Sequence, residues 1–193
     1  MKKKIIGITG QIAAGKSVVR EILAEKGFFV IDADEVSRLC MKKRSGVYQK
    51  ILACFGESVL QENGEIDRAK LGDAVFSDSV LLDKLEKIAQ PAIAEEIAHI
   101  VLNSDAKNIA LEAVHLIEAN FDGFCDEVWI VTRSEENAKR RLEKRGLDEK
   151  RISARLTSQK PPQIERANIE IKNDSDLPEL RRRVEEILGE NYE

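Results

Sequence analysis

Residues 10–17 read Gly10-Gln11-Ile12-Ala13-Ala14-Gly15-Lys16-Ser17, and this stretch decides how the rest of the chain is interpreted. It fits the pattern Gly-x-x-x-x-Gly-Lys-Ser. The apolar run at residues 5–9 predicts a buried parallel strand before it, and residues 17–26 carry apolar side chains at helical spacing after it. A strand, a loop bounded by glycines and a helix start together predict a phosphate-binding loop.

The residue types in this loop suit a nucleoside triphosphate. Backbone N–H groups of such a loop curl around an anion, and the helix N-terminus adds partial positive charge. Gly10 and Gly15 allow close approach of the backbone. We expect Lys16 to reach the outer phosphates and the Ser17 hydroxyl to ligate magnesium. The competing interpretation is a chance match in an ordinary strand-turn-helix connection. The predicted nucleotide-binding residues are Gly10, Gln11, Ile12, Ala13, Ala14, Gly15, Lys16, Ser17 and Val18.

Length and composition narrow the class of protein. The chain has 193 residues, 42% of them hydrophobic and 34% charged, and its net charge is −4. This length suits one compact domain with an insertion, and the charge gives no general footprint for nucleic acid or membrane, so we expect neither as a partner. No apolar run approaches the ~20 residues of a membrane span. We expect a monomer or a weak homo-oligomer.

The start of the chain and its cysteines indicate a cytoplasmic protein. Residues 1–4 are Met-Lys-Lys-Lys, but the apolar run behind them is short and leads directly into the loop, which argues against a signal peptide. Three widely spaced cysteines form no metal-binding pattern and fit a reducing compartment.

A second strand, predicted at residues 28–31, ends in Asp32-Ala33-Asp34. Carboxylates at the C-terminal end of a parallel strand point into the crevice where ligands bind in open α/β sheets. One aspartate could cap the helix expected at residues 35–41, and the other could face the site. Capping and catalysis are equally open for Asp32, whereas catalysis is favoured for Asp34.

The spacing of apolar side chains predicts a helical insertion at residues 45–104. Apolar side chains recur at helical spacing at residues 47–55, 71–76 and 81–102, and Pro91 is expected to start or kink a helix. We expect His99 to be a partly buried structural histidine. The insertion would serve as a lid or a lobe for substrate recognition.

The remaining strands are predicted at residues 108–113, 126–132 and 168–172, and a closing helix at 177–188. Five strands alternating with helices predict a three-layer α/β/α sandwich with a parallel five-stranded sheet. The predicted P-loop nucleotide-binding core is therefore 1–44 together with 105–193.

A basic lid is predicted within that core at residues 134–160. Residues 139–160 hold nine Lys or Arg against three acids. Arg141 and Arg145 are four residues apart and share a helix face. A solvated helix pair explains most of these charges. A guanidinium near a transferring phosphoryl group would also stabilise its charge, and a lid would exclude water.

These features favour a small-molecule kinase over other users of nucleoside triphosphates. A GTP-dependent switch would carry Asp-x-x-Gly and Asn-Lys-x-Asp, and neither pattern occurs. The chain is also short for the oligomeric ATPases.

Several motifs, in order and nearly end to end, resemble the dephospho-coenzyme A kinase family. They are Ile8-Thr9-Gly10 before the loop, Ile31-Asp32-Ala33-Asp34 with Arg38, Ile66-Asp67-Arg68 with Leu71, Leu85-Glu86-x-Ile88 before Pro91, Arg141-x-x-x-Arg145, Gln159, and Ala167 through Asn173.

The resemblance implies that ATP phosphorylates the ribose 3′-hydroxyl of dephospho-coenzyme A, the last step of coenzyme A synthesis. It implies Asp34 as the base for that hydroxyl, Lys16 on the ATP phosphates and Arg141 on the transition-state charge. Magnesium would be held by Ser17, and Asn173 would lie near the adenine. The insertion would bind the acceptor, with Arg38 and Arg68 as candidates for its phosphates.

Departures from the family pattern concern the loop and the acceptor. Gln11 and Ala13 stand where the family usually has more glycine, and Gln90 stands where it usually has histidine. The family's Pro-Leu-Leu-Phe-Glu appears here as 114–118, Val-His-Leu-Ile-Glu. Gln90 and His115 therefore fall in or near the implied acceptor contacts. The alternatives are a P-loop kinase of another small acceptor (a nucleoside, nucleotide or sugar) and a nucleotide-binding module without catalysis.

Overall fold

The computed structural model describes residues 3–76, 78–157, 159 and 161–191. Residues 1–2 at the start of the chain, and 158 and 160 at the end of the predicted lid, lie outside the described residues. Two compact units are formed: the first by residues 1–31 and 105–193, the second by residues 32–104. Each unit is described in turn below.

The first unit is built on a five-stranded sheet with the order β2-β3-β1-β4-β5. The registers of β1 with β3 and β4, and of β4 with β5, are parallel. Central β1 has neighbours on both sides and buries Ile6 and Ile8 completely, which explains its uninterrupted apolar run. The predicted α/β fold with a parallel sheet is confirmed. The strands are β1 (Lys4–Gly10), β2 (Phe29–Asp32), β3 (Asn108–Glu112), β4 (Glu127–Thr132) and β5 (Ile169–Lys172).

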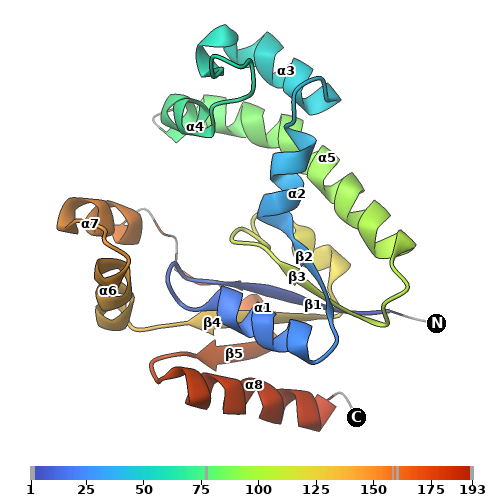
Figure 1. The fold of residues 1–193 in the computed structure, drawn as a ribbon, viewed down its shortest axis with the longest axis vertical. Helices are drawn as coiled ribbons and strands as arrows, with labels where there is room; N and C mark the ends of the chain where they lie inside the picture. The colour runs from blue at the N-terminus through green and yellow to red at the C-terminus, as the bar shows by residue number, and fades with distance from the viewer. Residues whose placement is uncertain (1–2, 77, 158, 160, 192–193) are drawn as a thin grey trace. The chain divides into compact units, whose positions relative to one another are not determined.

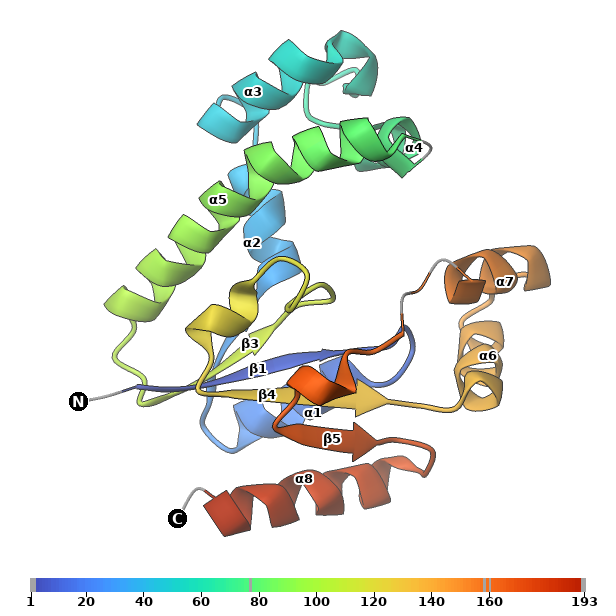
Figure 2. The ribbon, with the colours of Figure 1, turned by 180° about the vertical axis from the view of Figure 1, so that it is seen from behind.

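Helices α1 (Lys16–Glu25) and α8 (Leu177–Asn191) lie side by side against one face of this sheet (Figure 1). They enclose a core in which Trp129 of β4 is fully buried. The face seen from behind in Figure 2 carries two short turns, η2 (Phe121–Phe124) and η3 (Ile164–Arg166). An ion pair between Arg166 and Asp122 joins these turns.

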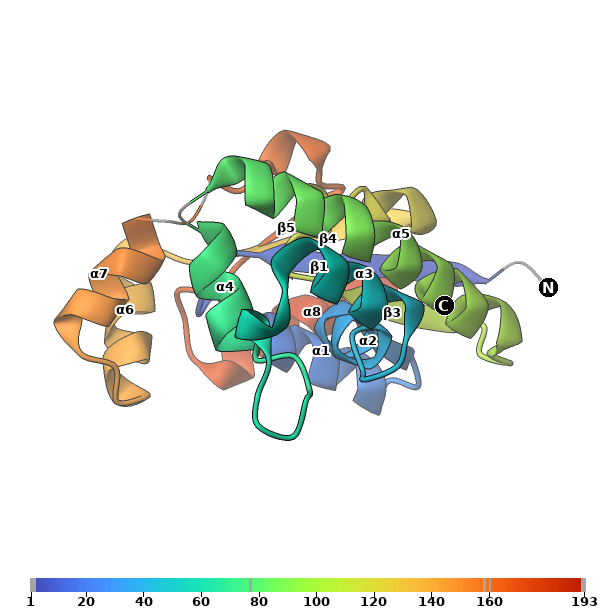
Figure 3. The same ribbon diagram turned by 90° about the horizontal axis from the view of Figure 1, so that it is seen from above.

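Helices α6 (Glu135–Lys144) and α7 (Glu149–Thr157) occupy the segment predicted to be a lid, and a closing motion of this segment stays a prediction. They lie side by side in Figures 1 and 3. Their shared core buries Ala138, Leu142 and Ile152 together with Ala13 of the phosphate loop. The lid is thus packed against the loop by apolar contacts.

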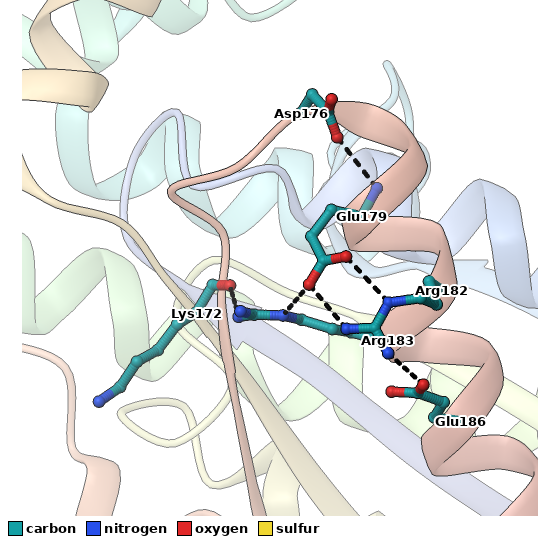
Figure 4. Close-up of polar contacts among 6 residues, drawn as sticks. All are labelled: Lys172, Asp176, Glu179, Arg182, Arg183 and Glu186. Carbon is teal, nitrogen blue, oxygen red and sulfur yellow. Dashed lines mark hydrogen bonds and ion pairs between the residues drawn. The ribbon is translucent and has the colours of Figure 1, made fainter.

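The closing helix α8 is tied down by a network of charged side chains (Figure 4). Asp176 Oδ1 accepts a hydrogen bond from Glu179 N at 3.1 Å, so Asp176 caps the helix. The Glu179 carboxylate accepts from Arg182 Nε at 2.9 Å and from Arg183 Nε at 3.2 Å. Arg183 Nη1 also donates to Lys172 O of β5 at 2.6 Å. The guanidinium groups of Arg182 and Arg183 therefore have hydrogen-bond partners within the fold.

The second unit is the predicted helical insertion. Its buried core includes Tyr48, Ile51, Ile66 and Leu71. Its helices are α2 (Ala33–Cys40), α3 (Gly46–Phe55), η1 (Glu57–Val59), α4 (Arg68–Phe76) and α5 (Ser79–Asn103).

The start of this unit differs from the prediction. We expected the insertion to begin at residue 45, but the unit begins at Asp32. The cause is α2, which packs along α5 of the same unit. Helical periodicity shows that a helix has an apolar face, and it does not show which neighbour covers that face.

Two local expectations about α5 can be compared with the structure. Pro91 was expected to start or kink a helix; it lies inside α5, which excludes a start, and a kink stays a prediction. Ala89, Ile93 and Ile97 are buried on both sides of that proline, and their packing maintains the helix despite the lost backbone hydrogen bond. His99 is exposed rather than partly buried, because it lies away from the face that contains Ile97.

Candidate active site

The loop between β1 and α1 needs glycine at both ends. Gly10 has φ +141° and Gly15 has φ +108°, conformations that side chains disfavour. A Cβ atom at Gly10 would lie 2.0 Å from Val131 O, and one at Gly15 would lie 2.4 Å from Asn173 Nδ2. The backbone therefore forms a cradle with no room for a side chain at either position, as a polyphosphate site requires.

Ala13 occupies a left-handed conformation with φ +57°, where glycine would be unstrained. A non-glycine residue in this region costs roughly 1–2 kcal/mol. The methyl group is buried against Ala138, Leu142 and Ile152 of the lid. Burial of the methyl offsets part of that cost, which accounts for alanine at a position where the family favours glycine.

The ammonium of Lys16 lies on the loop itself, where Nζ donates to Gly10 O at 2.9 Å and to Gln11 O at 3.1 Å. Lys16 is the first residue of α1, and the half-buried Ser17 follows it. Both side chains thus begin at the helix N-terminus, where the helix dipole favours an anion.

Two distant segments hold the loop from the side. Gln11 Oε1 accepts a hydrogen bond from Arg133 N, just beyond β4, at 3.1 Å. Gln159 Oε1 accepts one from Ile12 N at 3.0 Å. The glutamine at position 11, which departs from the glycine-rich family loop, therefore fixes the loop to the end of β4.

Asn173 and Arg141 lie at the other end of the loop. Asn173 is buried, and its Nδ2 donates to Ala14 O. Arg141 Nη1 lies 3.3 Å from the position that a Cβ of Gly15 would occupy. Burial, and secondly the charge of Arg145, lower the pKa of Arg141 below its ordinary value. Among the described residues no side chain forms a hydrogen bond with the Arg141 guanidinium. The structure brings Arg141 and Asn173 together at the loop.

Two hollows adjoin this cluster. One, of about 1360 Å³, lies between the loop and the lid and is lined by Gln11, Ile12, Arg133 and Gln159 among others. The second, of about 380 Å³, is lined by apolar Val18, Leu177 and Leu180, by the amides of Asn137 and Asn173, and by four cationic side chains, Arg133, Arg140, Arg141 and Lys144, among others. Its apolar groups and amides suit a heteroaromatic base, and its cations suit the phosphates attached to that base.

In the second unit, the two aspartates after β2 have different surroundings. Asp32 Oδ1 accepts hydrogen bonds from Asp34 N at 2.9 Å and Glu35 N at 3.1 Å, so Asp32 is the N-cap of α2. The Asp34 side chain is exposed in the first turn of the helix, and Arg38 is exposed one turn later. Asp32 therefore has the capping role that the sequence allowed for it, and a catalytic role for either aspartate stays a prediction.

The remaining predicted acceptor residues are dispersed. Arg68 is exposed at the start of α4, which Asp67 caps by accepting from Ala69 N at 3.0 Å and Lys70 N at 3.1 Å. Gln90 is half-buried in α5, and His115 is exposed in the turn after β3 in the first unit. Asp34, Arg38, Arg68 and Gln90 all belong to the second unit.

Sequence reasoning missed Arg133. It follows Thr132, the last residue of β4, and β4 is a neighbour of β1 in the sheet. The available signal was its place at the C-terminal end of a parallel strand, where ligand-binding residues gather.

In the part of the chain that the structure describes, no group of three or more His, Cys, Asp or Glu side chains could hold a metal ion. Within the same residues no helix is long and apolar enough to cross a membrane.

Comparison with known proteins gives consistent results. A sequence model described as dephospho-CoA kinase matches residues 4–179. The dephospho-CoA kinase of Carboxydothermus hydrogenoformans is 36% identical over 190 residues, covering 95% of this chain and 92% of that protein. The crystal structure of TT1252 from Thermus thermophilus aligns with a TM-score of 0.85 at 28% identity, with all of both chains covered. Dephospho-CoA kinase from Campylobacter jejuni aligns with a TM-score of 0.69 at 26% identity, covering 97% of this chain and 96% of that one.

Proposed function

This chain belongs to the dephospho-CoA kinase family, and from that premise we propose how its own residues carry out the reaction. The protein is a kinase that phosphorylates dephospho-CoA with ATP in the last step of coenzyme A biosynthesis. The observation that carries the assignment of roles is the loop cradle, with the Arg141 guanidinium beside Gly15.

The loop fits the polyphosphate of ATP. A Cβ at Gly10 would meet the backbone of Val131 and one at Gly15 would meet the side chains of Asn173 and Arg141, so both positions need glycine, and Lys16 begins the helix directly after Gly15. We assign the loop amides and Lys16 to the phosphates, the Ser17 hydroxyl to Mg²⁺, and the hollow beside Asn173 to the adenine. Bound Mg²⁺ would neutralise phosphate charge. Arg141 would stabilise the charge that develops on the transferring phosphoryl group.

We assign the general base to Asp34. Its carboxylate would accept the proton of the ribose 3′-hydroxyl as that oxygen attacks the phosphoryl group. Two observations support the choice of Asp34 over Asp32. Asp32 Oδ1 is taken by two backbone N–H groups, whereas the Asp34 side chain is exposed. Asp34 also follows β2 by two residues, and strand ends of α/β sheets carry ligand-binding groups.

The second unit is assigned to the acceptor. Exposed Arg38 and Arg68 would bind its phosphates, since guanidinium groups match phosphate oxygens. Gln90 and His115 would contact the remainder of the acceptor.

An acceptor assay tests the function. Purified protein with ATP and Mg²⁺ is expected to release ADP with dephospho-CoA far faster than with water, a nucleoside, a nucleotide or a sugar. A faster rate with one of those other acceptors would replace the assignment, and equal rates with every acceptor would remove it.

Exchange of each aspartate tests the assignment of the base. Asp34→Asn is expected to lower kcat by roughly 10²–10⁴-fold with ATP affinity retained, because an amide cannot accept the hydroxyl proton. Asp32→Asn is the matched control, because asparagine caps helices as well as aspartate. Turnover close to normal in Asp34→Asn, or an equal loss in both variants, would contradict the assignment.

A further inference from the structure

Arg133 lies where the loop, the lid and the end of β4 meet. Its backbone N–H donates to Gln11 Oε1 of the loop at 3.1 Å. Its side chain lines both hollows, the one between loop and lid and the one beside Asn173. A side chain at this position can reach a ligand that extends from one hollow to the other.

The guanidinium of Arg133 has unused hydrogen-bonding capacity. Its Nε is buried and has no hydrogen-bond partner among the residues that the structure describes. A buried donor without a partner destabilises the fold, and more so when it is charged. Burial, and secondly the charge of Arg141, lower the pKa of Arg133 below its ordinary value.

The acid that acts on Arg133 is engaged elsewhere. Asp174 attracts Arg133 electrostatically. Its Oδ1, however, accepts from Ser134 N at 2.8 Å, Ser134 Oγ at 2.7 Å and Asn137 Nδ2 at 3.0 Å. That carboxylate therefore fixes the start of α6, and the two neighbouring guanidinium groups repel each other without a bonded acid between them.

We propose that Arg133 is a second phosphate-binding arginine, which together with Arg141 binds the polyphosphate of ATP at the edge of the loop. This inference rests on the proposed binding of ATP by the loop. An anion between the two guanidinium groups would satisfy the buried Nε and remove their mutual repulsion. Phosphate is the anion favoured here because the loop cradle and Lys16 already select it, and the guanidinium fork binds phosphate oxygens in a bidentate manner.

Calorimetric binding of Mg·ATP and of adenosine to Arg133→Gln tests the proposal. We expect Mg·ATP to bind roughly 10–100-fold more weakly, as expected for loss of charge-assisted hydrogen bonds, and adenosine affinity to be unchanged. The melting temperature of the protein without nucleotide should not fall, because the side chain loses no bonded partner. The backbone N–H to Gln11 is retained in the variant. Arg182→Gln on α8, which removes the same charge far along the chain, should leave Mg·ATP affinity unchanged.

Other outcomes overturn the proposal. An unchanged Mg·ATP affinity in Arg133→Gln would show that the side chain does not bind the phosphates. An equal loss for adenosine would assign Arg133 to the base, and a fall in melting temperature without nucleotide would assign it a structural role. Arg133→Lys separates charge from geometry and should recover part of the affinity. Failure of the proposed function would instead appear in the wild-type protein, as Mg·ATP binding without turnover of dephospho-CoA.

Discussion

Two groups of arginines in the first unit differ in what surrounds their guanidinium groups. On α8, Arg182 bonds Glu179 and Glu186, and Arg183 bonds Glu179 and Lys172 O. Hydrogen bonding to Glu179 is the main cause of the raised pKa of Arg182. Beside the loop, burial lowers the pKa of both Arg133 and Arg141. The first group uses its donors to hold the fold, and the second is desolvated without an acid bonded to it.

The arginines of α8 contribute to the stability of the fold, whereas those beside the loop are available to bind a ligand. Exposed ion pairs such as those on α8 contribute at most about 1 kcal/mol each. A desolvated guanidinium costs folding free energy until an anion binds. The fold therefore tolerates unfavourable charge at the loop, and we expect that cost to be recovered when the nucleotide binds.

The largest effect expected from this comparison is on turnover. Arg141→Gln should lower kcat at saturating ATP by roughly 10³-fold, the lower end for an arginine that stabilises a transferring phosphoryl group. Arg182→Gln should change kcat by less than about twofold, because its partners lie on the surface of α8. Steady-state ADP release measures both. If the two variants lose similar activity, the distinction between the two groups is wrong.

The loop and α8 also differ in how their glycines would tolerate a side chain. Gly15→Ala places a Cβ 2.4 Å from Asn173 Nδ2 at φ +108°, so we expect a loss of roughly 1–3 kcal/mol in the free energy of unfolding and weaker Mg·ATP binding. Gly189 of α8 has no atom within 4 Å of its added Cβ, so Gly189→Ala should stabilise by roughly 0.5–1 kcal/mol through helix propensity. Urea denaturation measures both. A change of the same sign in the free energy of unfolding of both variants would contradict this expectation.

The smallest effect concerns Asp174, which fixes the start of α6 beside the loop. The hydrogen bond from Asn137, then those from Ser134, lower the pKa of Asp174 below 3.8. Because the folded pKa is depressed, the stabilisation is complete above the unfolded pKa and is lost as the pH falls through the folded value. Asp174→Asn should therefore cost about 1 kcal/mol or less at pH 7. The difference from wild type should shrink below about pH 4, where the unfolded carboxyl becomes protonated. Urea denaturation across pH measures it, and a difference independent of pH would contradict the ionic origin.

Most of the fold could be predicted from local sequence patterns. The apolar runs of β1 and β4 are long because both strands are buried within the sheet, and the loop motif needs its two glycines because both have positive φ angles. The boundary at Asp32 could not be predicted, because it depends on α2 packing against α5.

The candidate site was predictable to the extent that its residues are contiguous or belong to the family pattern. Lys16 and Ser17 follow from the motif itself. Arg133 could not be found in this way, because its backbone contact with Gln11 joins positions that are 122 residues apart in the chain. Which of the two aspartates caps α2 likewise could not be predicted, since both suit a cap in the sequence.

The methyl group of Ala13 has a mechanical consequence. It is part of the curled loop and also part of the apolar core of α6 and α7. A hinge motion of those helices away from the loop would expose this methyl to water and leave the strained backbone of residue 13 without its compensating contacts. The backbone conformation of the loop and the position of α6 and α7 are therefore coupled through the packing of the Ala13 methyl group.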